Sequence, residues 1–229
     1  MVFMPEYAPF KVLLFLGTIA LVGLCAVIAL FLWRTGRTAH TRAVVFVSLA
    51  ALAGYAAFWV GHSLVAPERI LAPDEWKYMC EIDCHLAYRV TGVHQSETLG
   101  EGDQALKGAG LFWVVSVETR FDENTISSRR PRDLRLYPNP RHIIVADAQG
   151  HTYAISGAGM KAIGQPKGEE DPFTRSLLPG ESYTVDLVFE LPRDVGNPRL
   201  LLTSAFWPDV VLIGHEQSPW HKKVWFALE

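Results

Sequence analysis

Hydrophobic positions form two long runs near the N-terminus and short alternating runs beyond residue 70. Residues 9–33 contain one charged side chain, Lys11, and residues 43–66 contain none. At about 1.5 Å per residue, each run reaches roughly 36 Å as a helix, which is enough to cross a hydrocarbon layer of about 30 Å. We therefore predict a transmembrane α-helical hairpin within an N-terminal anchor that comprises residues 1–69.

The orientation of this anchor follows from the distribution of positive charge. The loop between the two runs, residues 34–42, contains Arg34, Arg37 and Arg42. Positively charged loops stay in the cytoplasm. We therefore expect this loop to be cytoplasmic, and both termini and residues 70–229 to lie on the extracytoplasmic side of a bacterial cytoplasmic membrane. We expect no signal-peptide cleavage, because the first run has no basic flank and exceeds an h-region of about 7–15 residues.

Beyond the two long runs, short segments have the pattern of β-strands. Tyr183–Leu191 is the clearest, because every second residue is apolar and lies on one face of an extended chain. Asp147–Gly150 lies between two such segments and is typical of a hairpin turn, in which Gly150 can adopt a positive φ. The predicted strands are Leu86–Val93, Leu111–Thr119, His142–Ala146, Thr152–Ile155, Tyr183–Leu191, Leu200–Ala205, Val210–Ile213 and Lys223–Leu228.

The order of these segments indicates the fold class of the second part. No helices alternate with the strands, which argues against a parallel α/β sheet. About seven or eight short strands separated by turn residues are typical of an immunoglobulin-like fold. We predict that residues 70–229 form one all-β domain, an immunoglobulin-like antiparallel sandwich.

Several stretches of this region resemble a known family. They are Phe112–Thr119, Ile144–Tyr153, Leu178–Tyr183 and Leu187–Pro192. The region from Phe112 to Leu228 is similar to a bacterial family of immunoglobulin-like extracytoplasmic domains of unknown function, which is related to a small secreted mycobacterial immunogenic protein. The resemblance implies a β-sandwich fold and a non-catalytic module at the cell surface.

Composition and charge divide the chain at the same place. Residues 1–66 contain 46 apolar residues, whereas residues 70–229 contain 22 acidic and 16 basic side chains and carry a net charge of −6. This division excludes a single soluble core, and seven Trp and twelve Phe exclude a disordered chain. The acidic balance argues against a nucleic-acid partner. We expect the partners to be the lipid bilayer and another membrane or periplasmic protein.

Common catalytic motifs are missing from the sequence. There is no Gly-x-Ser-x-Gly elbow, no phosphate-binding glycine loop and no His-Glu-x-x-His helix. We therefore expect no catalytic residue, no cofactor and no enzymatic activity. The predicted function is a membrane-anchored interaction module, such as an accessory subunit of a membrane complex.

The segment from Cys80 to His85 is the sharpest candidate for chemistry. On the oxidising side of a membrane, Cys80 and Cys84 favour a disulfide. The chain must then turn between them, because an extended segment would separate their Cα atoms by about 13 Å. The alternatives are free thiols, or a copper or zinc site for metal delivery or electron transfer. Such a site would use both thiolates and His85, with His215 and His221 as further ligands.

A resemblance to a known protein family also supports the metal alternative. Two spans, an outer β-domain and a Cys-x3-Cys motif are similar to subunit II of cytochrome c oxidase, whose motif binds copper. This sequence departs from that pattern, because Tyr88 and Thr91 stand where that family's pattern calls for further ligands. The motif also comes early in the domain rather than late.

A cluster of arginines is the last candidate site. It comprises Arg129, Arg130, Arg132, Arg135 and Arg141. These side chains could bind an anionic polymer, a lipid headgroup or an acidic partner. The alternative is a solvated loop that neutralises part of the domain's negative charge, with Asp122 and Glu123 as internal partners.

Overall fold

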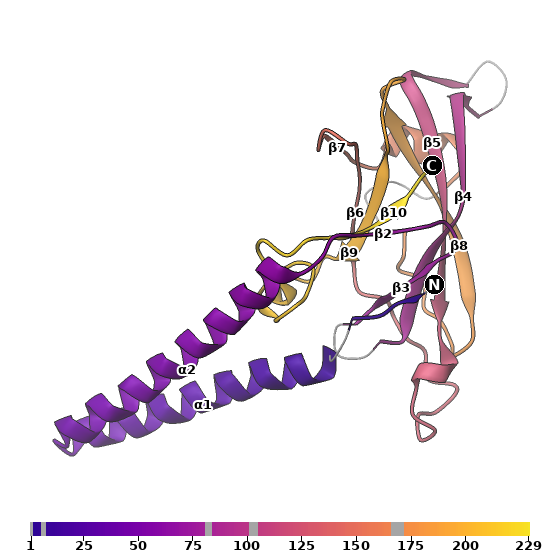
Figure 1. The fold of residues 1–229 in the computed structure, drawn as a ribbon. Helices are drawn as coiled ribbons and strands as arrows, with labels where there is room; N and C mark the ends of the chain where they lie inside the picture. The colour runs from indigo at the N-terminus through magenta and orange to yellow at the C-terminus, as the bar shows by residue number, and fades with distance from the viewer. Residues whose placement is uncertain (1, 6–7, 81–83, 101–104, 166–171) are drawn as a thin grey trace. The chain divides into compact units, whose positions relative to one another are not determined.

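The computed structural model describes residues 2–5, 8–80, 84–100, 105–165 and 172–229. The chain forms two compact units (Figure 1). The helical unit comprises residues 6–67 and 208–222, and the β unit comprises residues 1–5, 68–207 and 223–229. Residues 208–222 pack with the helices rather than with the strands that precede and follow them.

Two long helices, α1 (Ala8–Arg34) and α2 (Thr38–Val65), make up most of the helical unit. Both are long and apolar enough to cross a membrane, and almost none of their side chains is buried within the chain. The helices contact each other, with the ring centroids of Phe15 and Tyr55 6.0 Å apart. The two predicted helices are therefore present. Their apolar surface lacks cover from the rest of the described chain, as is typical of helices that face lipid.

The β unit contains two five-stranded sheets. The first has the order β1 (Val2–Phe3), β3 (Trp76–Met79), β4 (Leu86–Leu99), β5 (Leu106–Phe121) and β8 (Ser182–Leu191). The second has the order β2 (Arg69–Leu71), β10 (Val224–Ala227), β9 (Arg199–Ser204), β6 (Arg141–Ala146) and β7 (Thr152–Tyr153). Short helices, η2 (Glu123–Thr125), α3 (Gly157–Ala162) and η3 (Trp207–Val211), lie in the connections.

The sheets are mixed rather than purely antiparallel, so the predicted strand arrangement is wrong in this respect. β1 pairs with β3 in parallel, and β2 pairs with β10 in parallel. β1 precedes α1 and β2 follows α2, so both segments that flank the helix pair belong to the β unit. The chain leaves the β unit through α1 and returns to it through α2.

Seven of the eight predicted segments form strands, although Thr152–Ile155 does so only at Thr152 and Tyr153. The predicted hairpin joins β6 to β7, and Gly150 adopts a φ of 87°. The Asp147 carboxylate accepts hydrogen bonds from the backbone nitrogens of Gln149 and His151, each at 2.9 Å, and so fixes the turn. The strands β4 and β5 extend well beyond their predicted ends.

One predicted strand is wrong. Val210–Ile213 does not join a sheet, because Val210 and Val211 end η3 and the next two residues form a turn. The carbonyls of Val210 and Val211 accept hydrogen bonds from side chains of α2 instead of from a neighbouring strand. Contacts with the helix therefore decide the local conformation of this β-branched run.

One hydrophobic core lies between the inner faces of the two sheets. Its largest members include Trp113, Phe121, Phe189, Leu202 and Phe226. Lys77 of β3 also points inward and is only 1% exposed. Its Nζ donates hydrogen bonds to the carbonyl of Leu202 at 2.7 Å and to that of Val224 at 2.9 Å, and it thereby links the first sheet to the second.

Candidate functional site

Cys80 and Cys84 lie between β3 and β4 and form a disulfide. Their sulfurs are 2.07 Å apart and their Cα atoms are 4.2 Å apart, much closer than in an extended segment. Residues 81–83, which complete the motif, lie outside the described residues. Because the two sulfurs are bonded to each other, neither is available as a thiolate ligand in this state.

Loss of this disulfide is expected to lower the free energy of unfolding by about 2 kcal/mol, because the bridge closes a loop of only about five residues. The variant is Cys80→Ser with Cys84→Ser, measured by chemical denaturation of the purified full chain in detergent. Wild-type protein kept in reductant serves as the control and should approach the stability of the variant. Equal stability of the oxidised protein and the variant would show that the bridge contributes nothing.

His85 lies beside the disulfide and contacts the end of β5. Its ring stacks on Phe121 with centroids 5.8 Å apart, and its Nδ1 lies 2.9 Å from the hydroxyl of Thr125 in η2. These contacts tie the connection between β3 and β4 to η2. The imidazole therefore has a structural role in this arrangement.

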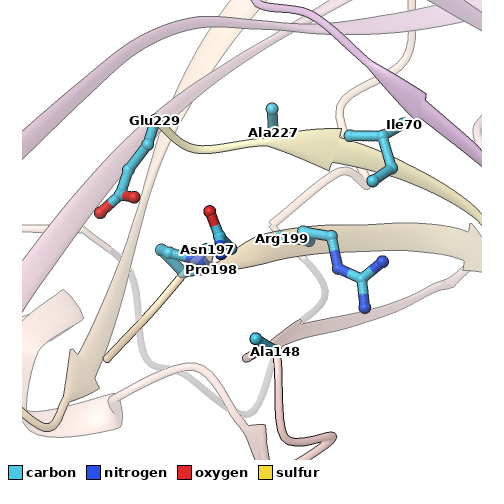
Figure 2. A pocket seen from close by; sticks show the side chains of 7 residues that line it. All are labelled: Ile70, Ala148, Asn197, Pro198, Arg199, Ala227 and Glu229. Carbon is cyan, nitrogen blue, oxygen red and sulfur yellow. The ribbon is translucent and has the colours of Figure 1, made fainter. Parts of the chain in front are cut away.

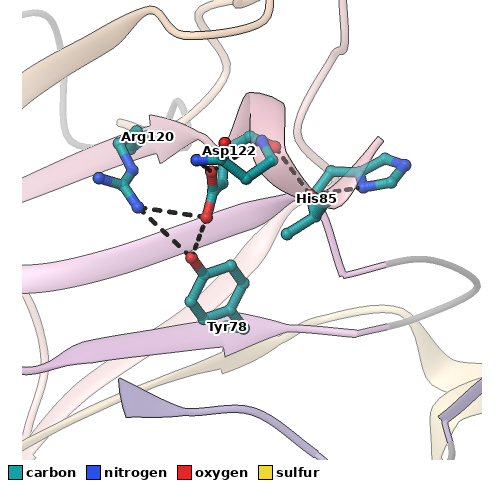
Figure 3. Close-up of polar contacts among 6 residues, drawn as sticks. Tyr78, His85, Arg120 and Asp122 are labelled. Carbon is teal, nitrogen blue, oxygen red and sulfur yellow. Dashed lines mark hydrogen bonds and ion pairs between the residues drawn. The ribbon is translucent and has the colours of Figure 1, made fainter. Parts of the chain in front are cut away.

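A polar network that the sequence did not reveal lies next to His85 (Figure 3). Asp122 directly follows β5 and accepts hydrogen bonds from the Tyr78 hydroxyl, from Arg120 Nη2 at 3.2 Å and from the backbone nitrogen of Asn124 at 3.1 Å. The Asp122 side chain is 9% exposed. Burial alone would raise the pKa of this carboxyl group. Hydrogen bonds from Tyr78 and Asn124 and the charge of Arg120 outweigh burial and lower the pKa.

The low pKa of Asp122 predicts a pH-dependent contribution to stability. A carboxyl group whose pKa is lower in the folded state stabilises the fold above its unfolded pKa of about 3.9, and this contribution is lost as the pH falls through the folded pKa. We expect Asp122→Asn to lower the free energy of unfolding by about 1–2 kcal/mol at neutral pH. The difference from wild type should shrink below about pH 4. Urea denaturation at pH 7, 5 and 3 measures it, and a difference that stays constant over this range would contradict the assignment.

The two histidines near the C-terminus belong to the helical unit, whereas His85 belongs to the β unit. His215 Nε2 lies 3.6 Å from the carboxylate of Asp209, and its Nδ1 accepts a hydrogen bond from the backbone nitrogen of Gln217. His221 Nδ1 lies 2.6 Å from the carbonyl of Lys222. Within the described parts of the chain, no three His, Cys, Asp or Glu side chains are grouped so as to hold a metal ion.

The predicted arginine cluster separates into two environments. Arg129, Arg130, Arg132 and Arg135 lie in the connection between η2 and β6. Arg141 begins β6 instead and is only 8% exposed, and its Nε donates a hydrogen bond to the hydroxyl of Tyr88 at 3.1 Å. Arg141 is therefore an interior side chain that an external anion does not reach.

The exposed members of the cluster lie on a segment that we name the arginine loop, residues 129–137. Arg132 lies 3.8 Å from Glu123, and Arg135 lies 3.6 Å from Glu181. All four of these side chains are about half exposed, so these ion pairs contribute little to stability. The internal acidic partner expected at Glu123 is present.

The arginine loop also exposes two large apolar side chains that no sequence motif indicates. Leu134 is 51% exposed and Tyr137 is 70% exposed. Between them in sequence, Leu136 forms two backbone hydrogen bonds with Leu177, at 2.8 and 2.9 Å, and packs against the core. The base of the loop is therefore fixed, and its exposed side chains include Arg129, Arg132 and Arg135. Arg130 is partly buried and its guanidinium lies over the ring of Phe121 at 5.3 Å.

The β unit also contains a pocket of about 410 Å³ (Figure 2). It is lined by Ile70, Ala148, Asn197, Pro198, Arg199, Ala227 and Glu229. The guanidinium of Arg199 donates to Glu68 at 3.1 Å and lies over the ring of Trp225 at 5.0 Å. Since this cation is already paired and stacked, the pocket offers mainly apolar surface.

Comparison with known proteins establishes no family for this chain. No family model matches it, and no curated protein matches it. Distantly similar solved structures include a conserved hypothetical protein from Bacillus anthracis, which is 18% identical with a TM-score of 0.39 over 56% of this chain and 92% of that chain. They also include MPT63, a secreted protein from Mycobacterium tuberculosis, which is 13% identical with a TM-score of 0.35 over 62% of this chain and 82% of that chain.

Proposed function

We propose that this protein is a membrane-anchored, non-enzymatic module that binds an acidic protein partner on the extracytoplasmic side of a bacterial cytoplasmic membrane. In this proposal, α1 and α2 are the anchor. The β unit is an immunoglobulin-like sandwich that presents the arginine loop to the partner.

The anchor and its orientation rest on three features. The side chains of α1 and α2 are apolar and exposed within the chain. Arg34 ends α1, Arg37 lies between the helices and Arg42 lies near the start of α2, and this concentration of positive charge favours the cytoplasmic side. The disulfide of the β unit favours an oxidising compartment on the opposite side.

The arginine loop is the observation that carries the proposed partner binding. Binding hot spots in protein interfaces are enriched in tyrosine and arginine. Here an exposed tyrosine, Tyr137, and an exposed leucine, Leu134, share a loop with three exposed arginines, and the base of the loop is held by strand-like hydrogen bonds. A surface that is already ordered loses less entropy on binding.

Charge indicates the kind of partner. Residues 70–229 carry a net charge of −6, so an acidic partner is repelled by most of the β unit and attracted by the arginine loop. Contact should then be confined to this loop. The copper or zinc alternative requires the thiolates of Cys80 and Cys84 to be free, whereas the disulfide occupies both of them.

Site-specific photo-crosslinking in native membranes tests the proposal. A photoreactive amino acid replaces Tyr137 in the full chain, and Gln149, which is exposed in the turn between β6 and β7, is the control position. We expect one adduct of defined mass from position 137 and none of that mass from position 149. Adducts of the same mass from both positions would overturn the assignment of the arginine loop.

Charge reversal provides the second arm of this experiment. Arg132→Glu combined with Arg135→Glu should reduce the adduct at position 137 about tenfold or more, which corresponds to about 1.4 kcal/mol of binding free energy. Arg193→Glu is the matched control, because Arg193 is also exposed and also pairs with a surface carboxylate, Glu97. An adduct that the double variant leaves unchanged would contradict the proposed acidic partner.

A further inference from the structure

We propose that residues 208–222 form an interfacial segment that lies in the outer leaflet of the bilayer beside α2. The membrane would then hold the chain through three elements rather than two. This inference rests on the proposed function, because it requires α1 and α2 to span the membrane. The partner of the segment is the phospholipid surface itself, and the contacts of the segment with α2 set its depth.

The contacts place the segment well below the C-terminal end of α2. The Tyr55 hydroxyl donates a hydrogen bond to the carbonyl of Val211 at 2.7 Å, and Trp59 Nε1 donates to the carbonyl of Val210 at 3.2 Å. α2 ends at Val65. At about 1.5 Å per residue, Tyr55 lies about 15 Å and Trp59 about 9 Å before that end.

The depth of Tyr55 and Trp59 in the membrane follows from the length of α2. A helix of 28 residues is about 42 Å long, which exceeds a hydrocarbon layer of about 30 Å by about 6 Å at each end when the helix is centred. Centring places Arg42 at the boundary on the opposite side. It also places Trp59 about 3 Å and Tyr55 about 9 Å inside the hydrocarbon boundary. Val210 and Val211, whose carbonyls accept hydrogen bonds from these side chains, then lie just inside the hydrocarbon boundary of the outer leaflet.

Backbone carbonyls of the segment have hydrogen-bond donors within the protein, as a water-poor environment requires. Irregular backbone is tolerated at membrane depth only where its polar groups find partners within the protein. The carbonyls of Val210 and Val211 are satisfied by Trp59 and Tyr55, and the carbonyl of Leu212 accepts from the Ser218 hydroxyl at 2.7 Å. Three consecutive carbonyls of an apolar run are thus satisfied by side chains. A loop in water would not require these partners.

The charged and tightly packed residues of the segment fit the same placement. Asp209 is 2% exposed and its carboxylate lies 3.6 Å from His215, so this charge faces the protein rather than the lipid. At Gly214, which has a φ of +68°, an added Cβ would lie 2.6 Å from both Lys11 Nζ and His62 Cε1. The segment therefore packs against side chains of both helices.

The outward-facing residues of the segment are those that favour a membrane boundary. Trp220 is 68% exposed, and its backbone has a φ of 61°, which is uncommon for a bulky residue. Lys222 is exposed two residues later. Trp side chains concentrate at membrane–water interfaces, and Lys side chains extend toward the headgroups. Both side chains therefore have the character expected at the membrane–water boundary.

Spin-label accessibility tests this inference with the full chain in vesicles of phosphatidylcholine and phosphatidylglycerol. Each variant carries one label, at Trp220→Cys or at Lys222→Cys, in a Cys25→Ser background. The Lys222→Cys variant keeps Trp220. Leu24→Cys, exposed near the middle of α1, is the lipid reference, and Gln149→Cys in the β unit is the water reference. Collision rates with oxygen and with a water-soluble nickel chelate give the depth of each label.

We expect labels at positions 220 and 222 to have oxygen and nickel collision rates between those of the two reference labels. Such rates correspond to the depth of the headgroups. In a Gly214→Val background, which displaces the segment, both labels should become about as accessible to nickel as the label at Gln149. Full nickel accessibility at 220 and 222 in the unmodified background, with Leu24 protected, would overturn the interfacial segment and leave the spans intact. Nickel accessibility at Leu24 would overturn the proposed anchor and this inference together.

Discussion

Replacement of Lys77 with methionine is expected to lower the free energy of unfolding by about 3 kcal/mol. Lys77 is 1% exposed and lies between the two sheets, where its ammonium group donates to the carbonyls of Leu202 and Val224. Methionine keeps most of the volume but removes the charged donor. Because both carbonyls lie on the opposite sheet, the variant should loosen the contact between the sheets rather than one strand alone.

Chemical denaturation of the purified full chain, followed by near-ultraviolet circular dichroism, measures this effect. Lys107→Met on β5 is the matched control, because Lys107 is exposed and its loss should change the free energy of unfolding by less than about 0.5 kcal/mol. Wild-type stability of the Lys77→Met variant would show that the buried ammonium group does not hold the sheets together.

Replacement of Gly110 with alanine is expected to lower the free energy of unfolding by about 3 kcal/mol. An added Cβ at this position would lie 2.0 Å from the carbonyl oxygen of Leu191 and 2.8 Å from its carbonyl carbon. Both atoms belong to the backbone at the end of β8, which cannot rotate away as a side chain can. The substitution therefore has to separate β5 from β8 near the paired residues Leu111 and Leu191.

Gly92→Ala is the matched control for this prediction. Gly92 also lies in a strand, β4, but its nearest neighbour would be the side chain of Ser116 at 3.9 Å, an ordinary contact distance. Its free energy of unfolding should change by less than about 1 kcal/mol. Equal losses in the two variants would attribute the effect to glycine in a strand in general rather than to the collision with Leu191.

The elements that the sequence predicted correctly are those in which one regular pattern of apolar residues extends over many consecutive positions. The two helices were predictable because their side chains are apolar throughout. Tyr183–Leu191 was predictable because one face is buried and the other is polar. Three short strands and the helix α3 were not predicted, and one predicted strand was wrong. β1, β2 and β3 are two, three and four residues long and carry no periodic signal. Val210–Ile213 has the composition of a strand, but hydrogen bonds from α2 give it a different structure.

The candidate site was also predictable from the sequence only in part. The turn between Cys80 and Cys84 followed from the geometry of a disulfide, whereas the network around Asp122 joins β3 to the end of β5 and depends on strand register. Arg141 was grouped with the arginine loop because it is near in sequence. Strand alternation places it inward together with Ile143 and Val145, so proximity along the chain was the wrong criterion.

The side of the membrane on which each part of the chain lies can be measured by cysteine labelling. A membrane-impermeant maleimide is applied to cells that carry single cysteines in the Cys25→Ser background, either Gln149→Cys in the β unit or Thr35→Cys between α1 and α2. We expect position 149 to be labelled in intact cells and position 35 to react only after the cells are permeabilised. Labelling of position 35 in intact cells, or of position 149 only after permeabilisation, would contradict a β unit held outside the cytoplasmic membrane by two spans.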